Sequence, residues 1–348
     1  MMRILIITDA WFPQVNGVVR TLDHLKRELE KQGHDLMFIT PDMFLSLPMP
    51  SYPEIRLSLT LTACVKRHIR EFGPDTVHIA TEGPLGITGS RACRGLGLSY
   101  TTSYHTRFPE YLRARVPVPV DWSYAWLRRF HNSGVGCLVA TQTVEDDLAA
   151  RGFKNLIRWT RGVDHEQFNP SRRNMEWLSS YPRPFFVNVG RVAIEKNLDA
   201  FLDLDLPGTK IVVGDGPDLA RLKREYPQAV FVGEKHGEEL AEAYASSDVM
   251  VFPSLTDTFG NVITESLACG TPVAGFPVTG PIDILSGTKA GICDADLGRA
   301  CLAALELDRD DAATEARKYT WERCAEIFLE AQQANLEQTE ERAGVPAA

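Results

Sequence analysis

Short apolar runs alternate with longer amphipathic segments along the first half of the chain. The apolar runs are rich in branched and aromatic residues, as buried strands are: residues 3–8, 35–40, 76–80, 98–103 and 136–141. The segments between them have the length and spacing of helices: residues 16–32, 84–96 and 109–133. Repeated strand–helix–strand connections predict an α/β fold with a parallel, doubly wound sheet.

The same pattern starts again after a polar, proline-bearing stretch at residues 168–184. Further strands are predicted, with helical segments between most of them: residues 185–189, 209–213, 229–232, 248–252 and 272–275. The chain therefore divides into two Rossmann-like domains, which we expect at residues 1–167 and 183–320. A last amphipathic segment at 321–340 forms a helix that follows the second domain.

The composition is that of a soluble globular protein, with 44% hydrophobic and 24% charged residues over 348 positions. No uncharged apolar run reaches the roughly 18–20 residues that span a bilayer, and we expect no secretory signal. The seven cysteines are scattered and contain no C-x-x-C pair, which is typical of reduced cytosolic thiols. We therefore expect a cytoplasmic protein.

The net charge of −9 is distributed unevenly along the chain. Residues 1–182 carry a net charge of +4, and the remaining residues carry −13. An acidic protein of this kind is not expected to bind nucleic acid, because dedicated nucleic-acid binders usually have a basic domain. The basic half is suited to an anionic surface, although plain variation in surface charge explains it equally well.

The first segment whose residues are suited to ligand binding is VNVGRVAIEKN at residues 187–197. Gly190 permits a tight exit from the predicted strand, and Arg191 and Lys196 follow within six positions. An arginine fork and a lysine point charge together suit one anion such as a pyrophosphate. The alternative is a surface loop in which Glu195 pairs with a neighbouring cation.

The second segment is FPSLTDTFGNVITESLACGTPV at residues 252–273. A strand ends at Phe252, a small polar loop follows, and a helix begins near Asn261. The free N–H groups of that helix start suit an anion, while Asp257 and Glu265 suit the hydroxyls of a sugar or ribose. The alternative is that Asp257 is an N-cap and Glu265 a charge favoured by the helix dipole.

These two segments together resemble a known family. G-R-x-x-x-E-K, followed by P-S-x-x-(acid)-x-F-G-x-x-x-x-E-x-x-x-x-G-x-P-V, is similar to the retaining glycosyltransferases of the GT-B fold, family 4. Further similar segments extend the resemblance through most of the chain: GDGPDL (214–219), RGVDHEQFNP (161–170) and YTWERCAEIFLE (319–330). The resemblance implies two Rossmann-like domains with an interdomain cleft, and a C-terminal helix (321–340) that returns to the first domain.

The resemblance also implies roles for residues of the second domain. Arg191 and Lys196 match the positions that hold the donor diphosphate, and Glu265 matches the carboxylate that binds the nucleotide ribose. Asp257 stands where most members have Glu, facing the donor sugar, so this chain departs from the family there. The remaining donor-binding residues belong to the adjoining loops: Gly190, Thr258, Phe259, Gly260 and Asn261.

Three residues of the first domain match family positions as well. Gly17 lies in PQVNGVVRT, where the family's first loop approaches the diphosphate, and Arg20 follows on the helix. His105 in SYHTRFPEYL matches the histidine of the cleft, which contacts the donor sugar or the reacting hydroxyl. A plain turn and a structural histidine are the alternatives. His78, with Glu82 nearby, is a weaker candidate.

The acceptor side is suggested by residues 107–134, where basic and aromatic residues interleave. Such a pattern suits a membrane interface with anionic lipids. An anionic soluble acceptor, with half of the aromatic residues in the core, is the alternative. The predicted membrane or acceptor residues are Arg107, Arg113, Arg115, Trp122, Trp126, Arg128 and Arg129.

The sequence thus predicts a retaining hexosyltransferase, with a nucleotide-sugar donor and a lipid acceptor such as diacylglycerol. We expect it at the inner face of the plasma membrane, and a UDP-sugar is favoured as donor. The alternatives are a GDP-mannose-dependent enzyme of surface polysaccharide assembly and a sugar-nucleotide epimerase. We expect no metal and no cofactor beyond the nucleotide sugar, because the D-x-D pairs at 203–205 and 294–296 lie outside the donor loops.

Overall fold

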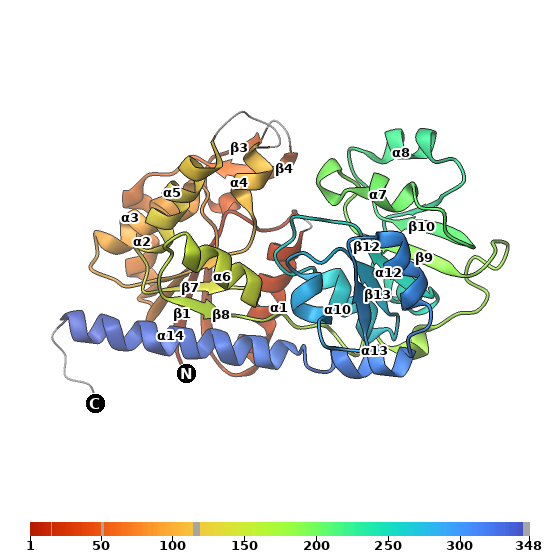
Figure 1. Ribbon diagram of the computed structural model, residues 1–348. Coiled ribbons are helices and arrows are strands. Elements are labelled where there is room, and N and C mark those ends of the chain that lie inside the picture. The colour runs from red at the N-terminus through yellow and green to blue at the C-terminus, as the bar shows by residue number, and fades with distance from the viewer. Residues whose placement is uncertain (15, 50–51, 114–118, 344–348) are drawn as a thin grey trace. The chain divides into compact units, whose positions relative to one another are not determined.

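The computed structural model describes residues 1–14, 16–49, 52–113 and 119–343, and these residues form two compact units (Figure 1). The N-terminal unit comprises Met1–Arg161 together with Trp321–Ala348, and the C-terminal unit comprises Gly162–Thr320. Within the described residues each unit contains a six-stranded sheet of parallel strands with helices on its faces. The predicted α/β class with two Rossmann-like halves is therefore confirmed.

In the sheet of the N-terminal unit, strands are added first on one side of β1 and then on the other. Its strand order is β2-β1-β5-β6-β7-β8. The bounds are β1 (Arg3–Ile7), β2 (Asp35–Ile39), β5 (Thr76–Ile79), β6 (Thr101–Tyr104), β7 (Gly136–Val139) and β8 (Leu156–Arg158). Because the chain goes first to one side of β1 and then to the other, the carboxyl ends of β1 and β5 form the switch point where open α/β sheets bind ligands.

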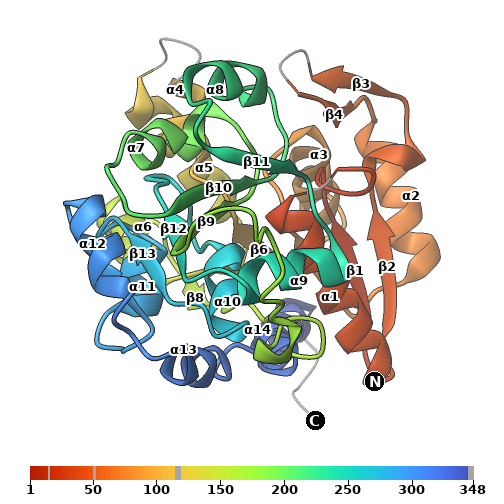
Figure 2. The same ribbon diagram turned by 90° about the vertical axis from the view of Figure 1, so that its right-hand side faces the viewer.

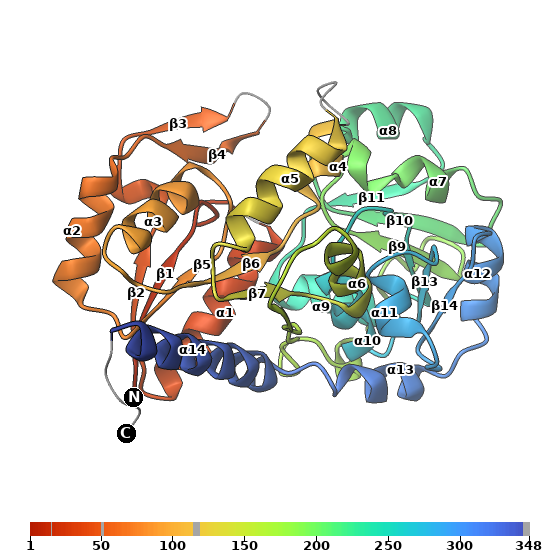
Figure 3. The same ribbon diagram turned by 60° about the vertical axis from the view of Figure 1, so that its left-hand side comes forward.

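Alternate residues of β1 face the two layers of helices around this sheet. Ile4 and Ile6 pack with α1 (Gly17–Lys31) and α14 (Trp321–Ala343), whereas Leu5 and Ile7 pack with α2 (Thr62–Phe72) and α3 (Pro84–Arg94). A strand covered on both faces needs apolar side chains at every position, which explains the uninterrupted run at residues 4–7. Figure 3 shows α2 and α3 side by side on one face of the sheet.

Helix α14 confirms the predicted return of the chain to the N-terminal unit. It lies beside α1, and its residues Cys324, Ala325 and Phe328 are fully buried in the same core cluster as Leu22 and Leu25 (Figure 1). The sequence predicted one helical region at 109–133, but the described residues form α4 (Phe108–Arg113) and α5 (Val120–His131). Helix α6 (Gln142–Ala150) and the two-stranded ribbon of β3 (Ser46–Met49) and β4 (Tyr52–Ser58) complete the unit.

The sheet of the C-terminal unit has the order β11-β10-β9-β12-β13-β14 (Figure 2). The strands are β9 (Phe185–Val189), β10 (Thr209–Val213), β11 (Val230–Gly233), β12 (Val249–Phe252), β13 (Val273–Gly275) and β14 (Gly291–Cys293). The helices are α7 (Leu198–Leu202), α8 (Leu219–Glu225), α9 (Gly237–Ala245), α10 (Asn261–Ala268), α11 (Pro281–Leu285), α12 (Leu297–Ala304) and α13 (Arg309–Ala316). Strand β9 is central, and both its neighbours pair with it in parallel.

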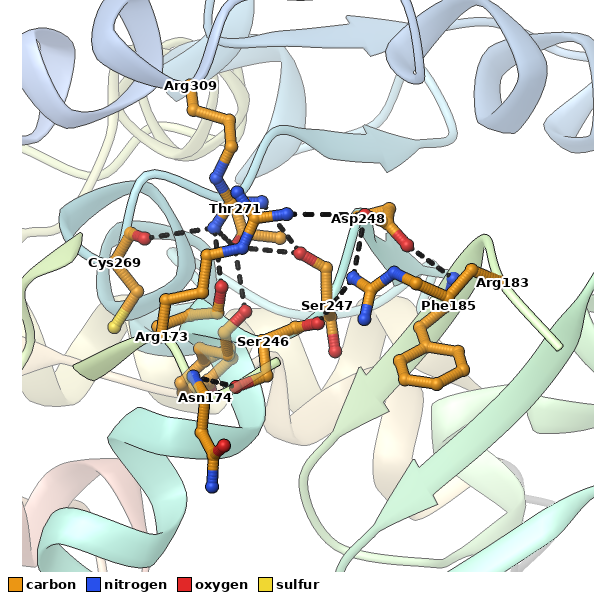
Figure 4. A network of polar contacts seen from close by, with 12 residues as sticks. Arg173, Asn174, Arg183, Phe185, Ser246, Ser247, Asp248, Cys269, Thr271 and Arg309 are labelled. Carbon is orange, nitrogen blue, oxygen red and sulfur yellow. Dashed lines mark hydrogen bonds and ion pairs between the residues drawn. The ribbon is translucent and has the colours of Figure 1, made fainter. Parts of the chain in front are cut away.

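Arg309 ties together the ends of two helices in this unit (Figure 4). Its guanidinium donates to the carbonyl oxygens of Ala245 and Ser247, both at 2.7 Å, and to that of Cys269 at 3.3 Å. Ala245 ends α9 and Cys269 follows α10, so a cation lies where two helix dipoles have their negative ends. The burial of this guanidinium lowers the pKa of Arg309 to about 10, which leaves it charged at neutral pH.

The polar stretch before β9 packs against the same unit. Arg183 donates to the carbonyl oxygen of Ser246 at 2.7 Å and to the carboxylate of Asp248 at 2.8 Å. The backbone N–H of Asn174 donates to the Ser246 hydroxyl at 2.9 Å. These contacts hold the stretch on the C-terminal unit, and the chain changes unit at Arg161 and again at Thr320. Among the described residues, no helix has the length and apolar character needed to span a membrane.

Candidate functional site

Two loops at the carboxyl edge of the C-terminal sheet hold most of the predicted donor residues. The first follows β9 and begins at Gly190, whose φ of 144° is a conformation that side chains disfavour. Its backbone is held by the loop after β10, because Val192 N–H donates to the Asp215 carbonyl at 2.9 Å. A Cβ on Gly214 would lie 1.8 Å from the Gly190 carbonyl oxygen, so the two loops meet backbone to backbone.

A short 3₁₀ turn, Ile194–Lys196, then brings Lys196 toward the loop that follows β12. Its ammonium donates to both carboxylate oxygens of Asp257, at 2.6 and 2.9 Å. Burial alone would raise the pKa of Asp257, but the Lys196 charge and hydrogen bonds, together with Ser254, hold it below its ordinary value. Asp257 is therefore a carboxylate at neutral pH, and the pair joins loops from two neighbouring strands.

The structure distinguishes the two roles predicted for Asp257, a sugar-binding carboxylate and an N-cap of α10. The residue at the N-cap position of α10 is Gly260, in a left-handed conformation with φ of 87°, so Asp257 does not cap this helix. Gly260 has no side chain with which to accept from the first N–H groups of the helix. Phe259, beside it, is buried and packs edge-on against Tyr319 with ring centroids 5.9 Å apart. Thr258 precedes this turn, and Asn261 is the first residue of α10.

Glu265 lies in α10 and is buried rather than solvated. The Tyr244 hydroxyl, from α9, donates to its Oε2 at 2.9 Å. A carboxylate in this position is oriented by a neighbouring helix, which a surface charge placed only for the helix dipole would not need. Arg191 stands directly after Gly190 in the first loop.

The N-terminal unit supplies the other predicted residues at the carboxyl edge of its own sheet. Gly17 is the first residue of α1, and Asn16 is the N-cap. The Asn16 side-chain oxygen accepts from the N–H groups of Val18 and Val19, both at 3.0 Å. Part of this helix terminus is therefore satisfied by its own cap. Arg20 follows in the first turn of the helix.

His105 comes directly after β6 and is partly buried beside Trp159. The guanidinium of Arg161 lies 3.2 Å from its Nδ1. A guanidinium can only donate, so Nδ1 accepts and the proton of the neutral ring is on Nε2. Burial first and the Arg161 charge second hold the pKa of His105 well below its ordinary value. The ring is therefore a neutral hydrogen-bond donor at physiological pH.

Arg161 itself is buried and held by backbone carbonyls. It donates to the carbonyl oxygens of Trp159 and Thr160, at 2.8 and 3.1 Å, and its guanidinium lies 4.3 Å from the Trp159 ring centroid. Burial lowers the pKa of Arg161 to about 10, so the side chain keeps its charge. Arg161 is the first residue of the segment RGVDHEQFNP, but the sequence predicted no role for it, because its partner His105 lies 56 positions away.

The structure assigns His78 to the core of the N-terminal unit. Its two ring nitrogens lie 2.8 Å from the Thr101 hydroxyl and 2.9 Å from the Ser103 hydroxyl, and burial lowers its pKa to about 3. Glu82 pairs instead with His131, whose Nε2 lies 3.0 Å from Oε1 of Glu82. His131 ends α5 and follows Tyr124 and Leu127 on its buried face, a spacing from which its burial could have been predicted.

Asp9 is a second buried carboxylate, and no pattern in the sequence predicted its contacts. It accepts from the N–H groups of Leu85 and Gly86, at 2.8 and 3.1 Å, and from the Thr81 hydroxyl at 2.8 Å. Burial is the largest influence and raises the pKa of Asp9. The Asp9 carboxylate thus satisfies the first N–H groups of α3, as an N-cap side chain would, although it lies far from α3 in the sequence. A Cβ on Gly83 would lie 2.4 Å from this carboxylate, which explains the glycine there.

Comparison with known proteins decides the family. Residues 15–167 match Glycosyltransferase Family 4, and residues 183–306 match Glycosyl transferases group 1. A GDP-mannose-dependent alpha-mannosyltransferase of Mycobacterium tuberculosis (strain CDC 1551 / Oshkosh) is 35% identical over 318 residues, which cover 83% of this chain and 83% of that protein. The chain belongs to glycosyltransferase family 4. It is therefore an enzyme of the glycosyltransferase class.

A further relative agrees with this family, and a solved structure agrees with the fold. The alpha-monoglucosyldiacylglycerol synthase of Streptococcus pneumoniae (strain ATCC BAA-255 / R6) is 28% identical over 313 residues, covering 78% of this chain and 70% of that protein. The structure of a sucrose-phosphate synthase from Thermosynechococcus elongatus superposes with a TM-score of 0.77 at 17% identity, covering 97% of this chain and 100% of the other. The predicted GT-B fold class is confirmed.

The predicted membrane or acceptor residues of this glycosyltransferase have different surroundings. Arg107 is partly buried and pairs with Asp147 at 3.1 Å, so its charge is compensated within the unit. Arg128 is exposed but donates to the Arg151 carbonyl at 2.9 Å. Trp122 and Trp126 are 74% and 42% exposed. Arg113 and Arg129 are exposed as well, and Arg115 lies outside the described residues.

Proposed function

We propose that this glycosyltransferase transfers a hexosyl unit from a nucleotide-diphosphate sugar to a lipid hydroxyl, with retention of the anomeric configuration. The observation that carries the proposal is the Lys196–Asp257 pair, with ammonium–carboxylate distances of 2.6 and 2.9 Å. It holds a cation and a carboxylate at the edge of the sheet where Arg191 also stands. A donor has a dianionic leaving group and a polyhydroxylated sugar, so both kinds of charge have a partner in it.

The chemistry of these residues follows from where charge develops during glycosyl transfer. As the glycosidic bond breaks, negative charge grows on the diphosphate, and groups fixed in advance stabilise it most effectively. Arg191 and Lys196 supply that stabilisation, with the start of α10 as a source of N–H donors. Lys196 then shares its ammonium between Asp257 and the phosphate, while Asp257 accepts from a hydroxyl of the sugar.

Three side chains position the rest of the reactants in this proposal. Glu265, oriented by Tyr244, accepts from the ribose hydroxyls of the nucleotide. His105 donates from Nε2 to the sugar or to the attacking hydroxyl. Because its Nδ1 accepts from Arg161, the neutral ring acts here as a donor and not as a base. The two cationic side chains take the part that a divalent ion has in other transferases, so we propose activity without added metal.

The donor remains a choice between two nucleotide sugars in this proposal. The resemblance of the sequence favoured a UDP-sugar, whereas the relative that is 35% identical is named for GDP-mannose. We therefore propose GDP-mannose as the first donor to test and UDP-glucose as the second. A lipid acceptor is supported by the relative named alpha-monoglucosyldiacylglycerol synthase and by the exposed tryptophans of α5.

The test is release of free nucleotide diphosphate by the purified protein. Each donor is supplied with and without vesicles that contain diacylglycerol, in buffer with a metal chelator. The proposal predicts release that requires both the donor and the vesicles, and a new glycolipid in the organic extract. Conversion of the donor sugar without nucleotide release would instead support an epimerase, and release with a water-soluble glycan alone would place the enzyme in polysaccharide assembly.

A further inference from the structure

A pocket of about 150 Å³ opens between α3 and α5 on the surface of the N-terminal unit. Both helices lie on the same face of the sheet (Figure 3). The pocket combines apolar side chains with three arginines: Ile87, Arg91 and Arg94 from α3, and Trp126, Arg129 and Phe130 from α5. Its position on the outer helices separates it from the loops at the carboxyl edge that hold His105 and Gly17.

Helical spacing explains how these side chains come together. Ile87, Arg91 and Arg94 stand at positions i, i+4 and i+7 of α3 and therefore share one face. Trp126 and Phe130 are four residues apart on α5, and their rings stack with centroids 6.3 Å apart at 18°. One wall of the pocket is thus aromatic, and the other carries two of the cations.

The three arginines of the pocket lack anionic partners among the residues that the structure describes. No hydrogen bond or ion pair of the Arg91, Arg94 or Arg129 side chain reaches another described residue. Helix α3 contains no acidic residue, and α2, α3 and α5 together hold seven Lys and Arg against two Asp and Glu. Like charges around one pocket repel unless an anion lies among them. The pocket therefore suits a ligand with an anionic and an apolar part.

A separate observation concerns the ribbon formed by β3 and β4 in the same unit. Leu47 pairs with Leu57, and the Leu59 N–H donates to the Leu45 carbonyl, so these four leucines share one face of the ribbon. Leu45, Leu47 and Leu59 are 74%, 54% and 55% exposed, whereas Ser58 on the opposite face is 3% exposed. The ribbon thus turns its serine face inward and its leucine face toward solvent.

An exposed aliphatic face of this kind is typical of a surface that contacts a membrane or another protein. Leu61, 72% exposed, continues it to the start of α2, where the exposed cations Arg67 and Arg70 follow. A water-soluble anion would account for the arginine pocket but would leave the leucine face without a role. An anionic bilayer satisfies both, since it offers phosphate at its surface and hydrocarbon beneath.

We propose that the N-terminal unit docks on an anionic phospholipid bilayer through these two features. The α3–α5 pocket binds a lipid phosphate between its arginines, with the adjoining apolar part of the lipid against Trp126 and Phe130. The leucine face of the β3–β4 ribbon contacts the hydrocarbon. Arginine suits this role because its planar fork binds phosphate oxygens in pairs, and tryptophan because its ring is favoured at the interface. This inference rests on the proposed function, because docking would bring the enzyme to its lipid acceptor.

The test is co-sedimentation of the full chain with vesicles, without any sugar donor. Phosphatidylcholine vesicles are compared with vesicles that contain about one third phosphatidylglycerol, at low and high salt. The variant Arg91→Gln/Arg94→Gln/Arg129→Gln is expected to bind the anionic vesicles at least about tenfold more weakly, because each basic residue at such a surface contributes about 1 kcal/mol. The matched control, Lys223→Gln/Arg224→Gln/Arg317→Gln in the C-terminal unit, removes the same charge and is expected to bind as the wild type does.

A second variant tests the leucine face. Leu45→Ser/Leu59→Ser is expected to lower vesicle binding at low and at high salt alike, since its loss is apolar. Leu302→Ser, at an exposed leucine of the C-terminal unit, is the control. All these positions are exposed, so circular dichroism and thermal melting are expected to match the wild type. Two results would overturn the pocket as a lipid site. One is equal vesicle binding by the wild type and the arginine variant. The other is that millimolar inorganic phosphate displaces lipid from the pocket while the protein stays on the vesicles through its leucine face.

The docking and the proposed transferase activity fail in distinguishable ways. Wild-type protein that ignores phosphatidylglycerol vesicles but releases nucleotide with a soluble acceptor would overturn the docking and leave the transferase standing. Wild-type protein that binds the vesicles but releases no nucleotide from any donor would leave the docking standing and overturn the proposed function.

Discussion

The carboxyl edges of the two sheets carry different kinds of polar group. In the C-terminal unit, charged side chains meet across loops, as Lys196 and Asp257 do at 2.6 Å. In the N-terminal unit, burial and the charge of Arg161 keep His105 neutral. The Asp9 carboxylate there accepts hydrogen bonds from backbone N–H groups of α3. We name the first the charged edge, after the Lys196–Asp257 pair, and the second the neutral edge, after the uncharged ring of His105. In the proposed function, the fixed charges of the first edge stabilise the diphosphate of the donor, and the neutral ring of the second donates to a hydroxyl group.

The largest effect is expected from removing the cation of the charged edge. Lys196→Ala should lower the turnover number by about 10²–10³-fold, because one fixed partner of the leaving group is lost. The Asp257 carboxylate also loses its ion pair, so Lys196→Arg, which keeps the charge, should recover part of the rate. Nucleotide release at saturating donor measures the effect, and thermal melting separates it from unfolding. A Lys196→Ala enzyme with wild-type turnover would show that the charged edge does not stabilise the leaving group.

A smaller effect is expected from the neutral edge. His105→Ala should lower turnover by about tenfold to a hundredfold, the cost of one hydrogen bond to a group that gains charge. The pH profile is the sharper measurement. Because the pKa of His105 is held well below 6.5, its neutral form persists as pH falls through that value, and the rate should show no histidine titration there. An inflection near pH 6.5 that disappears in His105→Ala would contradict the neutral ring.

The N-terminal unit also depends on polar contacts that serve stability alone. Gln332 of α14 is fully buried, accepts from the Thr76 hydroxyl and donates to the Thr101 hydroxyl, both at 2.8 Å. Gln332→Leu should lower the free energy of unfolding by about 1–3 kcal/mol, because two buried hydroxyls lose a partner. Urea unfolding measures this change. Gln333→Leu, at the exposed neighbouring position, is the control, and an equal loss there would show that the buried contacts are not the cause.

The smallest effect concerns the cap of α1 at the neutral edge. Asn16→Ala should lower the free energy of unfolding by about 1 kcal/mol, since its side chain satisfies the N–H groups of Val18 and Val19. Asn16→Gly should cost only a few tenths of a kcal/mol by the same principle. Urea unfolding compares the two variants. A larger loss for glycine than for alanine would show that the cap is not what Asn16 contributes.

The sequence pattern located most of the sheets because buried parallel strands are continuous apolar runs. Strands β1, β5 and β9 lie where the sequence predicts them, and the returning helix α14 does as well. The missed strands are short or lie at edges, such as β8 with three residues and β14 with three. A run of that length has no periodicity to read. Within the helical region expected at 109–133, the residues that the structure describes form α4 and α5.

The candidate site could be predicted residue by residue but not as a set of contacts. The motif G-R-x-x-x-E-K marked Arg191 and Lys196, yet the partner of Lys196 stands 61 positions away and comes together with it only because β9 and β12 are neighbours. Arg161 and His131 were missed for the same reason. Each acts through a partner distant in sequence, 56 positions from His105 and 49 from Glu82.

The proposed function requires that the charged edge of the C-terminal unit binds the donor diphosphate. Calorimetric titration of wild type and Lys196→Ala with GDP and UDP tests it most directly, with guanosine and uridine as ligands that lack the phosphates. We expect one diphosphate to bind the wild type, Lys196→Ala to weaken that binding at least about tenfold, and the nucleoside to show no such difference. Equal affinity of both proteins for that diphosphate would contradict the claim.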